Sequence, residues 1–182
     1  MRINAKDILI VIPARYKSSR FPGKPLVKIN GIEMIKRTYS RCKLSGHLPN
    51  NIVVATESKK IIKFCKKNSM NSIFTSSKCL TGTDRVAEVA KRLNYKYYIN
   101  LQGDEPIFNP EDIKNLINEV KKNPESIVNG YCQIKNNSQY LSINTPKVVI
   151  SKKNYLMYIS RAPIPTKAFK KNNKAFRQVC IY

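Results

Sequence analysis

The chain has 182 residues, 42% of them hydrophobic, which is enough for a folded core and excludes a disordered or fibrous protein. Lys and Arg number 34 against 11 Asp and Glu, for a net charge of +23. The basic residues are scattered along the chain singly and as Lys pairs, so we favour anionic small-molecule ligands over nucleic acid. No apolar run could span a bilayer and no signal-peptide pattern is visible, which predicts a cytoplasmic protein without a membrane partner.

The cysteines and the single histidine form no recognisable metal or disulfide pattern. No two of the five cysteines have CxxC spacing, and His47 has no visible catalytic partner. We therefore expect free thiols and a histidine without a catalytic role. All the acids lie at or before Glu125, so any carboxylate chemistry must come from the first part of the chain.

Predicted strands and helices alternate along the chain. The apolar run at 8–12 predicts a strand buried on both faces, which is typical of parallel sheets. Further strands are expected at 52–55, 73–74, 97–101, 127–133 and 147–150, and helices at 32–45, 59–67, 84–93 and 110–121. This order predicts a doubly wound α/β fold with a mostly parallel sheet, in which ligands bind at the carboxyl ends of the strands.

Local signals predict where the helices begin. Ser58 should cap the second helix, either Thr83 or Asp84 the third, and Asn109 the fourth, with Pro110 at its first helical position.

Spacing predicts which apolar side chains face the core. The first helix should bury one face, and a later aromatic segment also has core spacing. These residues are Ile32, Ile35 and Tyr39, then Tyr155, Tyr158 and Ile159.

A basic loop follows the first buried strand. Residues 13–25 carry four cationic side chains and two hydroxyls, a supply that suits a triphosphate. Gly23 would let the chain turn beside Lys24, and Walker A spacing is absent. By composition alone, a solvated basic loop is an equally good interpretation.

Three other segments carry candidate ligand-binding groups. Asp104, at the end of a predicted strand, could hold Mg²⁺ against phosphate oxygens, although Gly-Asp is also a common turn. The small residues at 81–83 would allow close approach of a flat base. Arg161, in a Pro-stiffened segment, could bind a carboxylate with two hydrogen bonds or form a surface ion pair.

Taken together, the segments IPARYKSSRFPGKPL, TGTDR, LQGDEP and SRAPIP resemble the 3-deoxy-manno-octulosonate (Kdo) cytidylyltransferase family, from about Ile8 to Tyr182. The resemblance implies a Rossmann-like nucleotidyltransferase fold, a mostly parallel sheet flanked by helices, as a single domain over residues 1–182. It implies transfer of CMP from CTP to the anomeric hydroxyl of Kdo for lipopolysaccharide synthesis, with Mg²⁺ and release of pyrophosphate. A homodimer is also expected from the resemblance alone.

The resemblance assigns roles to matching positions. Lys24, Asp104 and Arg20 are the implied catalytic residues, and Asp104 is the implied metal ligand. The implied nucleotide contacts are Ala14, Arg15, Ser18, Arg20, Lys24, Thr81, Gly82, Thr83 and Gln102. The implied contacts to the sugar acid or other anionic ligands are Arg85, Gln102, Arg161, Gln178 and Tyr182.

The sequence departs from the family pattern at several points. Cys79 and Gln178 each stand where the family usually has His, and Pro146 replaces a strand residue. The sequence ends at Tyr182, where the family continues with further elements and an Asp that completes the metal site. We therefore expect a fold without those C-terminal elements, and poor turnover by this chain alone.

Four functions stay open at this point. The chain could be an active Kdo cytidylyltransferase or a CTP-binding remnant without catalysis. It could also act on another acidic sugar. The fourth alternative is a basic protein that binds nucleic acid.

Overall fold

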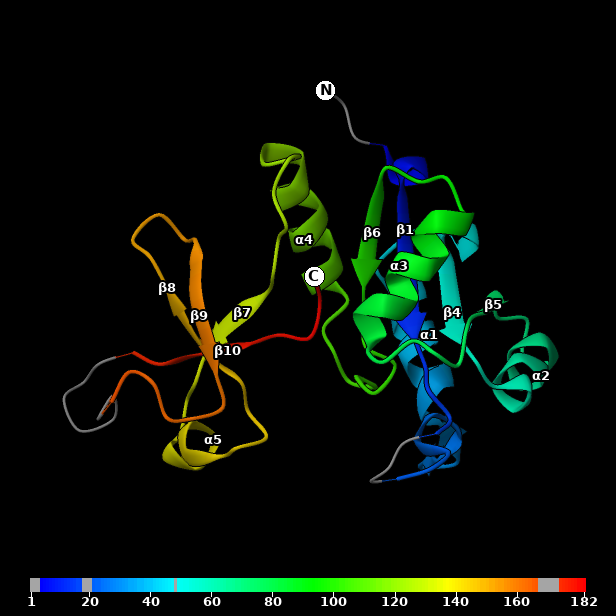
Figure 1. The fold of residues 1–182 in the computed structure, drawn as a ribbon, viewed down its shortest axis with the longest axis horizontal. Coiled ribbons are helices and arrows are strands. Elements are labelled where there is room, and N and C mark those ends of the chain that lie inside the picture. The colour runs from blue at the N-terminus through cyan, green and yellow to red at the C-terminus, as the bar shows by residue number, and fades with distance from the viewer. Residues whose placement is uncertain (1–3, 18–20, 48, 167–173) are drawn as a thin grey trace. The chain divides into compact units, whose positions relative to one another are not determined.

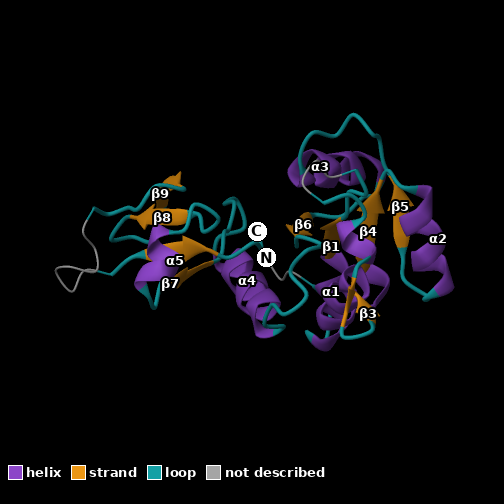
Figure 2. Ribbon diagram, turned by 90° about the horizontal axis from the view of Figure 1, so that it is seen from below, coloured by secondary structure: helices purple, strands orange, loops and turns teal. Residues whose placement is uncertain are grey.

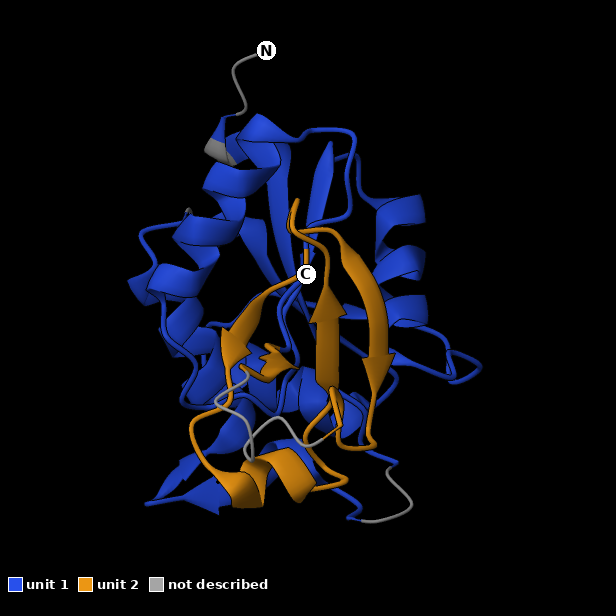
Figure 3. Ribbon diagram, turned by 90° about the vertical axis from the view of Figure 1, so that its left-hand side faces the viewer, with its two compact units in different colours: residues 1–128, 180–182 blue, residues 129–179 orange. Residues whose placement is uncertain are grey.

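The computed structural model describes residues 4–17, 21–47, 49–166 and 174–182. The chain divides into two compact units: unit 1 is residues 1–128 with 180–182, and unit 2 is residues 129–179 (Figure 3). That residues 1–182 act as one nucleotidyltransferase domain stays a prediction.

Unit 1 is built on a four-stranded parallel sheet. Its strands are β1 (Ile8–Pro13), β4 (Ile52–Thr56), β5 (Ser72–Phe74) and β6 (Tyr97–Asn100), in the order β5-β4-β1-β6. All three neighbouring pairs are parallel. Strand β1 is buried from Ile8 to Ile12, because apolar residues on both of its faces meet packed helices. The predicted parallel sheet is confirmed.

Helices cover both faces of this sheet. The helices of unit 1 are α1 (Met34–Leu44), α2 (Lys59–Lys67), α3 (Gly82–Arg92) and α4 (Glu111–Lys122). Figures 1 and 2 show α3 on one face of the sheet and α1 on the opposite face. The α3 side forms one apolar cluster of Leu9, Val11, Val53, Ala55, Val86 and Val89.

The start of the first helix differs from the prediction. Ile32–Glu33 forms strand β3, which pairs with β2 (Lys28–Ile29) as a hairpin. Asn30 and Gly31 both have positive φ, at 47° and 76°, as a tight hairpin turn requires. Ile32 is consequently 42% exposed, and its predicted burial on the helix is wrong, whereas Ile35 and Tyr39 are buried as expected.

Side-chain caps fix the starts of α2 and α3 but not that of α4. Ser58 caps α2 as predicted, its hydroxyl accepting the Ile61 N–H at 3.4 Å. The cap predicted for α3 is wrong: Thr81 is the N-cap, because its hydroxyl and the Asp84 carboxylate each accept the other's N–H. The prediction for α4 is wrong: its N-cap is Pro110, not Asn109, and the first helical residue is Glu111. The Asn109 side chain accepts the Glu111 N–H at 3.2 Å.

Unit 2 contains an antiparallel sheet. Its strands are β7 (Tyr131–Gln133), β10 (Phe176–Gln178), β8 (Lys147–Ile150) and β9 (Leu156–Ser160), in that spatial order, and α5 (Asn137–Leu141) is its helix. The predicted strand at 127–133 is therefore too long. Its first residue, Ile127, is 93% exposed.

The core prediction for the aromatic segment of unit 2 is wrong. Tyr155, just before β9, is 66% exposed. Tyr158 and Ile159, which point to opposite faces of β9, are 62% and 39% exposed, and the other residues from Leu156 to Ile159 are exposed as well. Pro146 lies just before β8, where its missing N–H removes no ladder bond.

The histidine and two of the five cysteines, Cys42 and Cys65, are buried. His47 is buried, and its Nε2 lies 3.1 Å from the carbonyl oxygen of Ile8. None of the five cysteines, all of which lie in the described ranges, forms a disulfide bond. Among the described residues, no helix is long and apolar enough to cross a membrane.

Candidate functional site

A cavity of about 400 Å³ opens in unit 1 at the carboxyl ends of β1 and β6. This is the edge at which parallel sheets bind ligands. Six of the residues predicted from sequence line it: Ala14, Arg15, Lys24, Gly82, Gln102 and Asp104. Ser18 and Arg20 lie outside the described residues.

A tight turn presents Lys24 to the cavity. Gly23 has φ of 75°, a left-handed conformation that favours glycine, and its N–H donates to the Tyr16 carbonyl at 2.8 Å. A 3₁₀ turn over Lys24–Leu26 follows, and Pro25 within it is buried. The Lys24 ammonium therefore projects from a backbone with little freedom.

Close backbone packing places Asp104 opposite Lys24. The Gly103 N–H donates to the Pro13 carbonyl at 3.3 Å, and a Cβ at Gly103 would lie 2.8 Å from that oxygen. Only glycine fits there without a shift of backbone. Asp104 follows at once, and its Oδ2 lies 2.6 Å from Lys24 Nζ in a pair whose side chains are 38% and 43% exposed.

The amino end of α3 forms another side of the cavity. Gly82 lines it, and the Thr81–Asp84 capping box fixes the first turn. The Thr81 N–H and hydroxyl lower the pKa of the Asp84 carboxyl. Arg15 Nη1 donates to the Leu80 carbonyl at 2.6 Å, which ties the basic loop to the segment before the helix. A helix amino end beside cationic side chains suits an anionic ligand.

The last residue of the sequence lies beside the predicted base segment. The hydroxyls of Tyr182 and Thr83 are 2.8 Å apart. The Tyr182 backbone pairs with Asn100, accepting its N–H at 2.6 Å and donating to its carbonyl at 3.2 Å. Two residues predicted to contact different parts of the ligands are thus in direct contact.

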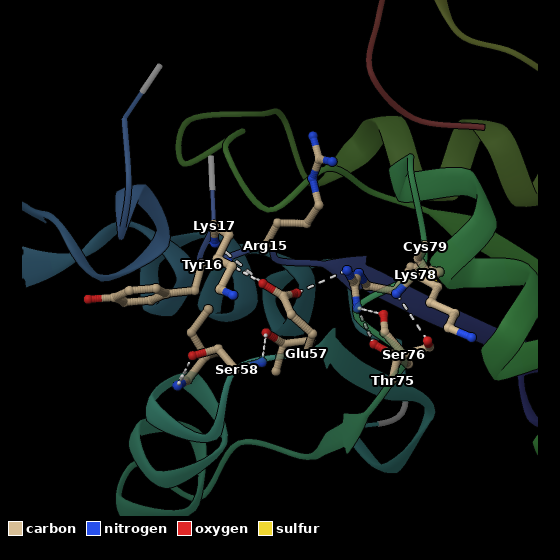
Figure 4. Close-up of polar contacts among 12 residues, drawn as sticks. Arg15, Tyr16, Lys17, Glu57, Ser58, Thr75, Ser76, Lys78 and Cys79 are labelled. Carbon is tan, nitrogen blue, oxygen red and sulfur yellow. Dashed lines mark hydrogen bonds and ion pairs between the residues drawn. The ribbon is translucent and has the colours of Figure 1, made fainter. Parts of the chain in front are cut away.

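Arg85, predicted to face anionic ligands, is buried in a polar network instead of lining the cavity. Its side chain is 1% exposed, and Nη2 pairs with Glu57 Oε2 at 2.9 Å. Glu57 was not singled out from the sequence, although it directly follows the buried strand β4, where a carboxylate could have been noticed. Figure 4 shows Glu57 between Tyr16 and Lys17 on one side and Thr75 and Ser76 on the other.

Arg161 and Gln178 belong to unit 2 and make their described contacts inside it. Arg161 Nη1 donates to the Ile143 carbonyl at 2.8 Å, and Gln178 Nε2 donates to Asn129 Oδ1 at 2.9 Å. The buried Lys147 ammonium donates to the Arg161 carbonyl at 2.6 Å, and burial lowers the pKa of this lysine. Their contacts with a sugar acid stay predictions.

The donor set at the cavity fits a metal ion only in company with phosphate. Within the described ranges, no group of three His, Cys, Asp or Glu side chains could hold an ion. Mg²⁺ is nevertheless often held by one or two carboxylates together with substrate phosphates and water. Asp104 could supply the carboxylate once its partner Lys24 turns to a phosphate.

Sequence comparison identifies relatives over nearly the whole chain. A family model described as "Cytidylyltransferase" matches residues 9–182. A 3-deoxy-manno-octulosonate cytidylyltransferase of Thermodesulfovibrio yellowstonii is 38% identical and covers 96% of this chain and 73% of the relative. A mitochondrial enzyme of the same name from Arabidopsis thaliana is 39% identical and covers 91% of this chain and 58% of the relative.

Comparison with solved structures also identifies a cytidylyltransferase as similar to this chain. A solved structure of CMP:2-keto-3-deoxy-manno-octonic acid synthetase complexed with CTP matches with a TM-score of 0.87 and 34% identity, covering 96% of this chain and 72% of that one. Together with the parallel sheet between helices, this match confirms the predicted Rossmann-like nucleotidyltransferase fold. The chain belongs to the cytidylyltransferase family.

Proposed function

We propose that this chain transfers CMP from CTP to the anomeric hydroxyl of Kdo, giving CMP-Kdo and pyrophosphate for lipopolysaccharide synthesis. The observation that carries the proposal is the cavity in which Lys24 and Asp104 meet beside the amino end of α3. Support comes from the relatives, which are named for this activity, and from the CTP in the similar solved structure.

Transfer of CMP requires positive charge around the triphosphate and correct positioning of the two substrates. The anomeric hydroxyl gives its proton to water, its oxygen bonds to the α-phosphorus, and the bond from that phosphorus to the pyrophosphate oxygen breaks. Lys24 and Arg15 would hold the triphosphate and offset its charge, and the base would lie against Thr81–Thr83. Gln102, which also lines the cavity, would lie between nucleotide and sugar.

We propose Mg²⁺ as the divalent cation, held by Asp104 and the phosphate oxygens. When bound, it would supply further neutralisation of the charge on the departing pyrophosphate. Lys24 would leave Asp104 for a phosphate as the nucleotide enters, which the exposure of both side chains permits.

Other parts of the proposal rest on the sequence pattern. Ser18 and Arg20 would contact the phosphates. Arg161, Gln178 and Tyr182 would contact the sugar acid, whereas Arg85 is buried against Glu57 and is not assigned to it. Another acidic sugar stays an alternative. A homodimer and a cytoplasmic location also stay predictions.

Release of pyrophosphate tests the proposal. We expect release only when CTP, Kdo and a divalent cation are all present. We expect none when UTP replaces CTP or when a sialic acid replaces Kdo. Binding of CTP without release would favour a CTP-binding protein without catalysis. A folded sample that neither binds CTP nor releases pyrophosphate would overturn the proposal.

A further inference from the structure

The Glu57 carboxylate joins segments that are far apart in the sequence. Its Oε1 accepts the N–H of Tyr16 at 2.9 Å and that of Lys17 at 3.4 Å. Its Oε2 pairs with Arg85 of α3 at 2.9 Å. Figure 4 shows this arrangement around Glu57, which follows directly from strand β4. One side chain thus holds the start of the basic loop and the helix that bounds the cavity.

Arg85 extends the connection to a third segment. Its Nη1 donates to the Thr75 hydroxyl and to the Ser76 carbonyl, the latter at 3.3 Å. Arg85 also lies in the first turns of α3, just after Gly82, which lines the cavity. Movement of the α3 start away from the basic loop would therefore pull on the guanidinium and its carboxylate partner.

Burial makes this connection stiff. The side chains of Arg85 and Glu57 are 1% and 9% exposed, so the pair is largely shielded from solvent. Separating a buried pair leaves a charge without a partner, which is far more costly than opening an exposed pair. The hydrogen bond from Arg15 to the Leu80 carbonyl also joins the basic loop to the segment before α3, but this contact is exposed.

The two segments that Glu57 connects would hold opposite ends of a nucleotide. We define the phosphate loop as the described residues 13–17 and 21–25, and the base segment as Thr81–Thr83. The Tyr16 and Lys17 N–H groups donate to Glu57 and are not available to a phosphate, whereas the Arg15 and Lys24 side chains line the cavity. Glu57 therefore acts on the nucleotide through the position of these segments.

We propose that Glu57 is a positioning residue that, through Arg85, fixes the spacing between the phosphate loop and the base segment. The inference rests on the proposed function, because that function places a nucleotide across both segments. A ligand that spans two correctly spaced subsites gains affinity from the high effective concentration of its second half. Correct spacing should matter for CTP and little for either of its halves.

The test compares three ligands in the full chain. Glu57→Gln keeps the side-chain volume and an oxygen for the loop N–H groups but removes the charge opposite Arg85. We expect the variant to bind CTP about tenfold more weakly, while cytidine and inorganic tripolyphosphate each stay within about twofold. Calorimetry for CTP and tripolyphosphate and NMR titration for cytidine would give the dissociation constants.

Glu88→Gln is the matched control. Glu88 also accepts a backbone N–H, from Ser76 at 2.8 Å, and also pairs with an arginine, Arg92, at 3.5 Å. No described contact joins it to the phosphate loop, so its CTP affinity should stay within about twofold of the unmodified chain. If Glu57→Gln does not fold, Glu57→Gln/Arg85→Gln replaces it, since that variant leaves no unpaired buried charge.

Equal weakening of all three ligands, or unchanged CTP affinity in a folded variant, would overturn the positioning role. If the unmodified chain does not bind CTP, the proposed function fails, and amide hydrogen exchange then decides on Glu57. Faster exchange at Tyr16 and Lys17 in Glu57→Gln than in Glu88→Gln would support the link. Equal exchange in the two variants would contradict it.

Discussion

Two carboxylate–cation pairs stand at the carboxyl ends of parallel strands in unit 1, and they differ in exposure. Lys24 and Asp104 are 38% and 43% exposed, whereas Arg85 and Glu57 are 1% and 9% exposed. An exposed pair contributes about 0–1 kcal/mol and can exchange partners, while loss of one member of a buried pair costs about 3–5 kcal/mol. Similar groups thus have different roles: the exposed pair can bind ligands, and the buried pair maintains the geometry.

The largest expected effect comes from breaking the exposed pair on its acidic side. Asp104→Asn removes the charge that we assign to the metal, and pyrophosphate release should fall by about 10²–10³-fold. The exposed Glu111, paired with Lys114 in α4, gives the control Glu111→Gln, which should keep full activity. Activity of Asp104→Asn close to that of the control would remove Asp104 from the mechanism.

The buried pair should dominate stability. Glu57→Ala leaves Arg85 buried without its partner and should lower the free energy of unfolding by about 3–5 kcal/mol. Lys24→Met removes the cation of the exposed pair and should change the free energy of unfolding by about 0–1 kcal/mol. Urea denaturation of both variants measures these free energies of unfolding. Losses of similar size would show that the buried pair contributes no more to stability than the exposed pair.

The capping box of α3 adds a smaller, pH-dependent contribution. The Thr81 N–H and hydroxyl lower the pKa of Asp84 in the folded chain. This stabilisation is therefore present above the ordinary aspartate pKa and is lost as the pH falls through the lowered value. Asp84→Asn should be less stable than the unmodified chain at pH 6, and the difference should shrink in acid. A difference that is constant with pH would contradict this assignment.

Burial should also decide which thiols react. Burial raises the pKa of Cys65 to about 11 and that of Cys42 further still. Neither should be modified by a thiol reagent at pH 8 in the folded chain, and both should be modified after denaturation. Mass mapping of the labelled cysteines measures this, and rapid labelling of Cys42 in the native chain would be the contrary result.

The sequence predicted the parallel sheet well, because long buried apolar runs such as Ile8–Ile12 leave few alternatives. It also brought together the residues of the cavity, since Lys24 and Asp104 each follow a buried strand. The helix starts were less certain, because Thr81, Thr83 and Asp84 are all good capping residues and only the reciprocal bonds select one of them.

Other features depend on contacts that no local pattern reveals. The burial of Arg85 requires Glu57 from a different strand end, and no sequence motif links these two residues, which are 28 positions apart. The Asn30–Gly31 hairpin could have been predicted from its dipeptide, which favours positive φ at both positions. The apolar residues Leu156–Ile159 of β9 in unit 2 are all exposed, so an apolar run alone could not separate this strand from a buried one.

A calorimetric titration with CTP in the presence of Mg²⁺, on the unmodified chain and on Lys24→Met, tests the central claim most directly. If the cavity lined by Lys24 and Asp104 holds the triphosphate, the unmodified chain binds CTP and the variant binds it at least about tenfold more weakly, with its fold intact. Equal affinity in the two proteins, or no binding by the folded unmodified chain, would contradict the account.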